Sequence, residues 1–194
     1  MRVSLTSGAW LGHDAAWLSR DEADEALAAL RDELTWEQRE IVLFGRPILQ
    51  PRLIAWAGDH GYRYSGQTLE PRPFTPTAAR LLARVQAHAG VAFNHVLANR
   101  YRSGDDSMGL HADDEPELGP DPPVAIVSLG AVRRLVIRPR RKGDVNRHDL
   151  DLGHGALLLM GGTFQRHYVH GVPRRPGVEG ERVSLTFRRL LRAP

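Results

Sequence analysis

The pattern of apolar residues predicts two helices in the first half of the chain. Within residues 20–34 they recur at helical spacing, and Ser19 with Glu22 has the form of a capping box. A second helix is predicted for residues 76–88, because Thr75 is a good N-cap, a proline follows it, and a glycine comes soon after the last apolar turn.

Outside these helices the pattern changes to short apolar runs punctuated by glycine and proline, which is typical of strands. The runs are EIVLF, FNHVLANRY, PVAIVSLG, RRLVIRP, GALLLMGG and RVSLTF. Two early helices and many short strands predict a β-sandwich or jelly roll with the helices packed on one face. The length of 194 residues favours a single domain.

Composition narrows the class of protein. The chain is 42% hydrophobic and 25% charged, as soluble globular proteins are. It has no cysteine, which excludes disulfides, thiolate metal sites and a cysteine nucleophile. The sequence shows no signal-peptide core. No apolar stretch approaches the length of a membrane span, about 20 residues, so we expect a cytoplasmic protein that does not enter membranes.

The basic residues are almost all arginines. The net charge is +3, and Lys142 is the only lysine among 26 basic residues. Arginine pairs bidentately with phosphate, which suits nucleic acid, although a biased base composition in the genome predicts the same excess. The candidates for phosphate contacts are Arg133, Arg134, residues 138–142, Arg147, Arg174 and Arg175.

The stretch GLHADDE contains a candidate metal site. In an extended strand His111 and Asp113 point to the same side, and a second histidine from elsewhere would complete a 2-His-1-carboxylate site. A lone His-x-Asp pair is common on surfaces, so a third ligand is needed to distinguish a metal site from a surface pair. The downstream stretch HYVHGVP offers His167 and His170.

Alternate residues of RVSLTFR form a polar and an apolar face. The polar face consists of Arg182, Ser184, Thr186 and Arg188. Two arginines on an inward face require carboxylate partners, which a dicarboxylate ligand would supply. The alternative is an edge strand whose arginines lie in water. Asn99 and Tyr101 share one face of another predicted strand and add polar contacts.

The motifs NRYRSGDDSMGLHADDE, PVAIVSLGA, HGALLLMGG, HYVHGVP and RVSLTFR, in this order, resemble the AlkB family of Fe(II)- and 2-oxoglutarate-dependent dioxygenases. The resemblance covers roughly residues 40–191 and is closest to the members that repair double-stranded DNA. It implies an α+β fold with a double-stranded β-helix (jelly-roll) core and the two N-terminal-half helices packed on one sheet. Residues 1–194 would form one domain, with the helices and nucleotide-recognition hairpin or lid in about 1–90 and the catalytic jelly roll in about 91–194.

The resemblance also implies roles for single residues. His111, Asp113 and His170 match the iron ligands, and His170 is preferred to His167 because it directly precedes GVP. The residues that match the 2-oxoglutarate site are Asn99, Tyr101, Arg182, Ser184 and Arg188. Asn99 and Tyr101 would hold the ketoacid end or the chain, and the two arginines the carboxylates. We expect Arg188 to meet the carboxylate far from iron, or to brace it. Ser184 stands where an asparagine is common, so we expect a lost hydrogen bond and weaker co-substrate binding, but not lost activity.

The implied activity is oxidative removal of alkyl groups from N1-methyladenine- and N3-methylcytosine-type lesions in flipped bases. Fe(II) is the cofactor, 2-oxoglutarate and O2 are co-substrates, and formaldehyde, succinate and CO2 are released. Asp114 and Glu115 follow the metal motif, and Glu115 matches an acid that faces the cationic base; otherwise they begin a solvated loop. Such lesions cannot pair normally, so flipping them costs less.

The stretch EIVLFGRPILQPRLIAWAGDHGYRYSG resembles the recognition hairpin and nucleotide lid. Leu43 and Phe44 would form an apolar wedge at its tip, unless Phe44 is a core residue of an ordinary strand. Arg52 matches a DNA contact, and Tyr62 and Tyr64 match the aromatic lid over the base. The lid is about two residues shorter than the family pattern and has Tyr64 where phenylalanine is usual, so the preferred lesion stays open.

The expected partner is DNA carrying alkylated bases, with double-stranded DNA favoured and single-stranded DNA as the alternative. No obligate protein partner is evident. One rival hypothesis is a dioxygenase of this family that acts on RNA, protein or a small molecule. Another is a catalytically silent jelly roll that binds nucleic acid, which the filled ligand positions argue against.

Overall fold

The computed structural model describes residues 2–43, 45–64 and 67–191, with only the backbone at positions 42, 43, 63 and 64. Phe44 therefore lies outside the described residues, as do the side chains of Leu43 and Tyr64. The predictions for these three side chains stay predictions. None of the described helices is long and apolar enough to cross a membrane.

Both predicted helices are present; each begins at the predicted residue and ends within one residue of the prediction. Helix α1 spans Arg20–Glu33, and its capping box is complete because Ser19 and Glu22 each accept the other's backbone N–H. Helix α2 spans Pro76–Ala89, with Thr75 as N-cap and a left-handed Gly90 after it. A short helix that was not predicted, α3, spans Phe164–His167.

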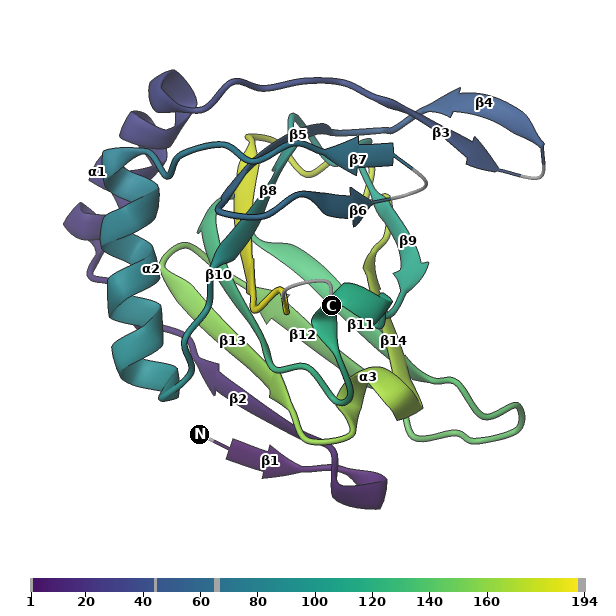
Figure 1. Cartoon of the computed structure of the whole chain (residues 1–194). Helices are drawn as coiled ribbons and strands as arrows, with labels where there is room; N and C mark the ends of the chain where they lie inside the picture. The colour runs from purple at the N-terminus through teal and green to yellow at the C-terminus, as the bar shows by residue number, and fades with distance from the viewer. Residues whose placement is uncertain (1, 44, 65–66, 192–194) are drawn as a thin grey trace.

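Strands β8 to β15 form the predicted jelly roll. They are β8 His95–Tyr101, β9 Met108–His111, β10 Val124–Gly130, β11 Arg133–Pro139, β12 His148–Leu152, β13 Ala156–Gly161, β14 Tyr168–Val172 and β15 Arg182–Arg188. One sheet has four strands in the order β12-β11-β14-β9, and the other has seven in the order β1-β2-β13-β10-β15-β8-β5. Figure 1 shows the two sheets enclosing the centre of the molecule.

The first 90 residues contribute strands as well as helices. They are β1 Arg2–Ser4, β2 Trp10–Asp14, β3 Glu40–Leu43, β4 Arg46–Leu49, β5 Leu53–Gly58, β6 Tyr62–Tyr64 and β7 Gln67–Leu69. Strands β1, β2 and β5 extend the seven-stranded sheet at its two edges, while β3–β4 and β6–β7 are separate hairpins. The β3–β4 hairpin projects from the body of the molecule (Figure 1). Two short 3-10 helices, Thr6–Gly8 and Pro116–Leu118, complete the elements.

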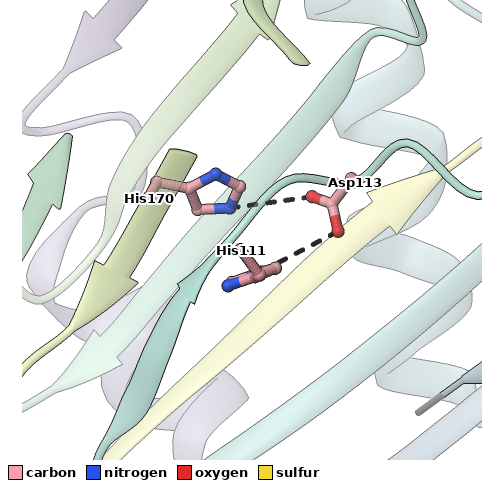
Figure 2. Close-up of side chains that lie close together, drawn as sticks. All are labelled: His111, Asp113 and His170. Atoms are coloured by element: carbon pink, nitrogen blue, oxygen red, sulfur yellow. Dashed lines mark ion pairs between the residues drawn. The ribbon is translucent and has the colours of Figure 1, made fainter. Parts of the chain in front are cut away.

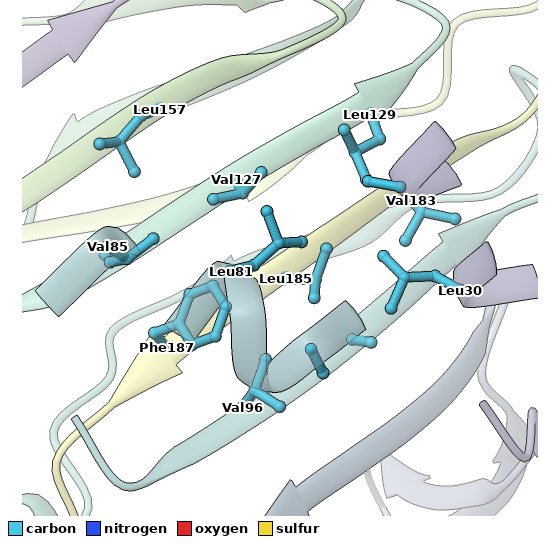
Figure 3. Packing of buried hydrophobic residues seen from close by; sticks show 14 of the residues in the cluster. Leu30, Leu81, Val85, Val96, Val127, Leu129, Leu157, Val183, Leu185 and Phe187 are labelled. Carbon is cyan, nitrogen blue, oxygen red and sulfur yellow. The ribbon is translucent and has the colours of Figure 1, made fainter. Parts of the chain in front are cut away.

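The outer face of the seven-stranded sheet packs against α1 and α2. Leu30 of α1 and Leu81 of α2 lie over Leu185 and Phe187 of β15 in one apolar cluster (Figure 3). A second cluster, which includes Ile126, lies between the two sheets. The apolar faces of the sheet and of the helices are thus buried together, and this fixes which face of the sheet turns inward.

Strand β15 lies in the middle of this sheet, between β10 and β8. All seven residues of β15 are buried. The alternative of an edge strand with arginines in water is therefore wrong, because the polar face of RVSLTFR points into the space between the sheets while its apolar face meets the helices.

Candidate metal and co-substrate site

Three side chains that could bind a metal meet between the sheets. His111, Asp113 and His170 each offer a ligand atom, and these atoms all lie within 4.8 Å of one another. His111 ends β9, His170 lies on the neighbouring strand β14, and Asp113 follows in the loop after β9 (Figure 2). His111 and His170 are direct partners in the β-ladder, so strand pairing brings residues 59 positions apart side by side.

A glycine permits this close approach of β14 to β9. A Cβ at Gly171 would lie 2.8 Å from the carbonyl oxygen of Met108 and 2.9 Å from that of Gly109. These are backbone atoms, which move only if the strands separate. Gly171 directly follows His170, so the residue with no side chain sits where the two histidine-bearing strands are closest.

The ring of His111 is oriented by its own strand. Its Nδ1 lies 3.0 Å from the carbonyl oxygen of Gly109, an atom that can only accept, so Nδ1 is the protonated nitrogen. The other nitrogen, Nε2, is 4.0 Å from Oδ1 of Asp113. An imidazole with one N–H on a carbonyl and the other nitrogen without a proton is the usual form of a metal ligand.

The charges at the cluster also suit a cation. Burial lowers the pKa of His170 to about 3 and lowers that of His111, so both rings are neutral at neutral pH. Burial raises the pKa of Asp113, but Arg188 and the two histidines outweigh it, and the pKa falls to about 2. Oδ2 of Asp113 is buried without a hydrogen bond from any described residue, and it lies 3.7 Å from Nε2 of His170. Two neutral imidazoles and a carboxylate oxygen without a partner are the donor set that Fe(II) takes in facial sites.

A cavity that is partly open to solvent adjoins these residues. Its polar lining includes all the residues predicted for the co-substrate site: Asn99, Tyr101, Arg182, Ser184 and Arg188. Both arginines are 2% exposed. On each guanidinium Nη1 is buried and has no hydrogen-bond partner among the described residues. Two buried cations with spare N–H groups fit a ligand with two carboxylates, as 2-oxoglutarate has.

The two arginines have different partners in the structure. Arg188 donates from Nη2 to Oδ1 of Asp113 at 2.6 Å and from Nε to the same oxygen at 3.1 Å, so it lies at the metal end of the cavity. Arg182 instead donates from Nε to Ser128 Oγ at 2.9 Å. Its guanidinium lies 5.3 Å from the ring centre of Tyr101. Arg188 is therefore tied to the metal cluster, whereas Arg182 is held by Ser128 of β10.

The residues predicted to contact the substrate differ in their exposure and in their partners. Glu115 is half-buried, and burial raises its pKa, whereas Asp114 is exposed and pairs with Arg140 at 2.6 Å. Tyr62 is fully buried, and its ring lies 4.9 Å from that of His95. Arg52 is 5% exposed. Both side chains are therefore buried, and their roles as a lid over the base and as a DNA contact stay predictions.

The basic residues predicted to contact phosphates fall into three groups: one is buried, some are paired with aspartates, and some are exposed without an ion pair to any described residue. Arg133 is 2% exposed and donates to three backbone carbonyls, those of Ser103, Asp106 and Pro173, at 2.7–2.9 Å. It is an internal brace and cannot reach a phosphate, so that prediction is wrong for Arg133. The arginines at 134, 138, 140 and 174 are paired with aspartates. Arg141, Lys142, Arg147 and Arg175 are exposed and form no ion pair within the described residues.

Two residues that hold the site were missed. Gln165 of α3 is 1% exposed and accepts the backbone N–H of Asp113 at 3.0 Å, which fixes the loop after β9. Ser128 is the hydrogen-bond acceptor for Arg182. The sequence could have indicated Ser128, since it is the single polar residue in the apolar run PVAIVSLG. Nothing in the sequence pattern indicated Gln165, because α3 itself was not predicted.

Comparison with known proteins agrees with this geometry. The family model of the 2OG-Fe(II) oxygenase superfamily matches residues 11–188. The solved structure of OsALKBH1 superposes with a TM-score of 0.68 and 19% sequence identity, covering 97% of this chain and 100% of that one. The fold and the site therefore define an Fe(II)- and 2-oxoglutarate-dependent dioxygenase that uses O2.

Curated relatives narrow this class. The chain is 41% identical over 183 residues to the mouse and human proteins named DNA oxidative demethylase ALKBH2, covering 88% of this chain and 76% and 69% of theirs. It is 40% identical over 175 residues to the rat alpha-ketoglutarate-dependent dioxygenase alkB homolog 3, covering 86% of this chain and 59% of that protein. The chain belongs to the AlkB family.

Proposed function

We propose that this protein is a DNA-repair dioxygenase that removes alkyl groups from N1-methyladenine- and N3-methylcytosine-type lesions. The observation that carries the proposal is the His111–Asp113–His170 cluster beside a cavity with two buried arginines that have N–H groups to spare. The relatives named DNA oxidative demethylase support DNA as the substrate.

His111, Asp113 and His170 hold the iron in this proposal. When bound, Fe(II) with 2-oxoglutarate and O2 supplies the oxidation of the N-alkyl carbon, which leaves as formaldehyde. Arg182 and Arg188 bind the co-substrate carboxylates, and Arg188 also fixes Asp113 through two hydrogen bonds. The apolar residues between the sheets, which include Ile126 and Leu135, exclude water from the other walls of the cavity.

Glu115 is the residue that faces the damaged base. It follows Asp113 by two positions and is half-buried, and its charge interacts with that of Asp113, although Glu115 is not one of the three clustered residues. Bases methylated at N1 of adenine or N3 of cytosine carry a positive charge, which a nearby acid favours. Asp114 serves a different purpose, because its ion pair with Arg140 ties the loop after β9 to the end of β11.

Double-stranded DNA is the proposed form of the substrate. The β3–β4 hairpin ends at positions 43–46, and the described strand β4 exposes Ile48 at 45% and Leu49 at 54%. Apolar side chains on a projecting hairpin are costly in water and suit insertion into a base stack. Leu43 and Phe44 are the proposed wedge at its turn.

The test is to incubate the purified protein with Fe(II), 2-oxoglutarate and air on oligonucleotides that carry one 1-methyladenine or 3-methylcytosine. Mass spectrometry follows the methyl group on duplex and single-stranded DNA. We expect loss of the methyl group, faster on the duplex; a preference for the single strand would contradict the wedge. If neither form of DNA loses its methyl group while succinate is still formed, the protein is a dioxygenase but DNA is not its substrate. The substrate would then be RNA, protein or a small molecule.

A pair of histidine variants tests the metal assignment in the same assay. His170→Ala removes a ligand and should lower succinate formation at least about a hundredfold. His167→Ala changes the rival histidine, which is outside the cluster, and should leave most of the activity. Equal effects of the two variants would contradict the assignment of His170.

A further inference from the structure

Arg52 lies beside the co-substrate cavity, just before β5. Its Nε donates to Oδ1 of Asn99 at 2.8 Å, and its Nη1 donates to the backbone carbonyl of Ser107 at 3.2 Å. Burying an arginine is costly unless its donors are used, and these contacts account for its position.

The bond from Arg52 settles which way the amide of Asn99 points. A guanidinium only donates, so the atom it meets on Asn99 must be the carbonyl oxygen. The Nδ2 group is then the part of the amide left to donate elsewhere. Asn99 is 2% exposed and lines the cavity together with Tyr101 and Arg188.

This orientation matters because the expected ligand has negative ends. An Nδ2 group donates to a carboxylate, whereas a flipped amide would present its own oxygen and repel it. The neighbours of Asn99 across the ladder are Ser184 of β15 and Ile54 of β5. Ile54 has no polar side chain, and a serine hydroxyl both donates and accepts, so neither imposes one orientation as a guanidinium does.

The chain around Arg52 is itself held in place. The N–H of Arg52 donates to the carbonyl of Gln50 at 2.8 Å, and the N–H of Ser107 donates to the carbonyl of Pro51 at 2.9 Å. Ser107 directly precedes β9, the strand that carries His111. Arg52 thus has a fixed backbone and two fixed acceptors, which is what a residue that orients another side chain requires.

We propose that Arg52 is a positioning residue for the co-substrate, which holds the amide of Asn99 so that Nδ2 donates to 2-oxoglutarate. The inference rests on the proposed role of Asn99 in the 2-oxoglutarate site. It assigns Arg52 to the co-substrate side of the cavity and not to DNA. The consequence is that Arg52 affects 2-oxoglutarate affinity even when no DNA is present.

Calorimetric titration of 2-oxoglutarate into the Mn(II)-loaded protein tests this without turnover. Arg52→Met removes the donors at similar length, and we expect its Kd for 2-oxoglutarate to rise about tenfold. Arg52→Lys keeps one donor group, so its Kd for 2-oxoglutarate should rise less. Adding Arg52→Met to Asn99→Ala should raise the Kd little further, because residues that act through one another are not additive.

Arg100→Met is the matched control. Arg100 neighbours Asn99 on β8, but its Nε donates to Glu181 at 2.7 Å on the other face of the sheet. It should leave the Kd for 2-oxoglutarate unchanged, and urea unfolding of each variant shows that the comparison is between folded proteins. Fluorescence anisotropy should show DNA affinity within about twofold of wild type for Arg52→Met.

Two results would overturn the proposal. A wild-type Kd for 2-oxoglutarate in Arg52→Met, with Asn99→Ala weakened, would leave Asn99 in the site and refute the role of Arg52. A wild-type Kd in Asn99→Ala would refute the role of Asn99 and with it that of Arg52. Neither result depends on whether DNA is the substrate.

Discussion

Arg188 and Asp113 form a buried ion pair at the metal cluster. The guanidinium donates twice to Oδ1 of Asp113, and both side chains are 2% exposed. Oδ2 has no hydrogen bond from a described residue and is directed at His170. One oxygen of the carboxylate is thus fixed by the protein, and the other is left for a metal.

Removal of Arg188 should destabilise the metal-free protein strongly. Arg188→Met leaves the Asp113 carboxylate buried without its cation, and breaking such a pair costs about 3–5 kcal/mol. The free energy of unfolding, measured by urea titration in EDTA, should fall by about that amount. Mn(II) supplies a new positive charge, so it should restore more stability to the variant than to the wild type.

The control for this experiment is Arg134→Met. Arg134 pairs bidentately with Asp151, but both side chains are nearly half exposed, so the loss should stay below about 1 kcal/mol. Equal losses of unfolding free energy in the two variants would show that the buried Arg188–Asp113 pair stabilises the protein no more than an exposed pair does.

Substitution of Gly171 should disturb the metal cluster without touching a ligand. A Cβ there would meet the carbonyl oxygens of Met108 and Gly109, so β14 and β9 must separate and move His170 away from His111. For Gly171→Ala we expect stability to fall by about 1–3 kcal/mol and the affinity for Mn(II) to fall about tenfold or more.

Gly109→Ala is the matched control, since it lies on the facing strand and a Cβ there has open space. Its carbonyl, which accepts from His111, is unchanged by the substitution. Calorimetric titration with Mn(II) should give near wild-type affinity for this variant. A wild-type affinity in Gly171→Ala as well would mean that the strands tolerate the extra atom.

Much of this site could be predicted from the sequence because its signals are local. Alternation along β15 placed Arg182 and Arg188 on one inward face, and the i, i+2 spacing placed His111 and Asp113 together. Helix α1 began where its capping box predicted. Each of these depends only on residues close together in the chain, where spacing and geometry are linked directly.

The prediction that failed, a phosphate contact for Arg133, depends on partners far along the chain. Arg133 is buried because three carbonyls from two loops converge on it, at residues 103, 106 and 173. The burial of Tyr62 against the ring of His95 likewise depends on a residue from another strand. Nothing in the spacing around Arg133 shows that such acceptors exist, so a surface arginine was the natural expectation.

The contact between α1 and α2 predicts a pH dependence of stability. Glu33 accepts from the backbone N–H of Thr77 at 3.0 Å and from its hydroxyl at 2.7 Å. Burial raises the pKa of Glu33, but the hydrogen bonds from Thr75 and Thr77 outweigh it and lower the pKa below its ordinary value. The carboxylate therefore stabilises the fold above pH about 4.3, and this stability is lost as the pH falls through the lowered pKa.

Glu33→Gln tests this dependence. At pH 7 the free energy of unfolding should fall by about 1–2 kcal/mol, and the difference from the wild type should shrink as the pH falls below about 4. Glu25→Gln on the same helix changes an exposed ion pair with Arg80 and should cost less than about 0.5 kcal/mol. A difference for Glu33→Gln that stays constant from pH 7 to about pH 3 would contradict the assignment.

The β11–β12 loop should contribute to DNA binding through charge alone. Arg141, Lys142 and Arg147 are exposed there and pair with no described acid, whereas the neighbouring Arg138 and Arg140 are neutralised by aspartates. Free cations on a loop release counterions when they meet phosphates, and this makes the affinity depend on salt.

Replacing Arg141 and Lys142 by serine should weaken DNA binding by a similar factor for every sequence. The slope of log affinity against log salt should become shallower by about 0.9 for each phosphate that the variant no longer neutralises. Arg20→Ser, on α1 at the outer face of the seven-stranded sheet, is the control and should leave the slope unchanged. Fluorescence anisotropy at several salt concentrations measures both quantities, and an unchanged slope in the double variant would place the DNA elsewhere on the surface.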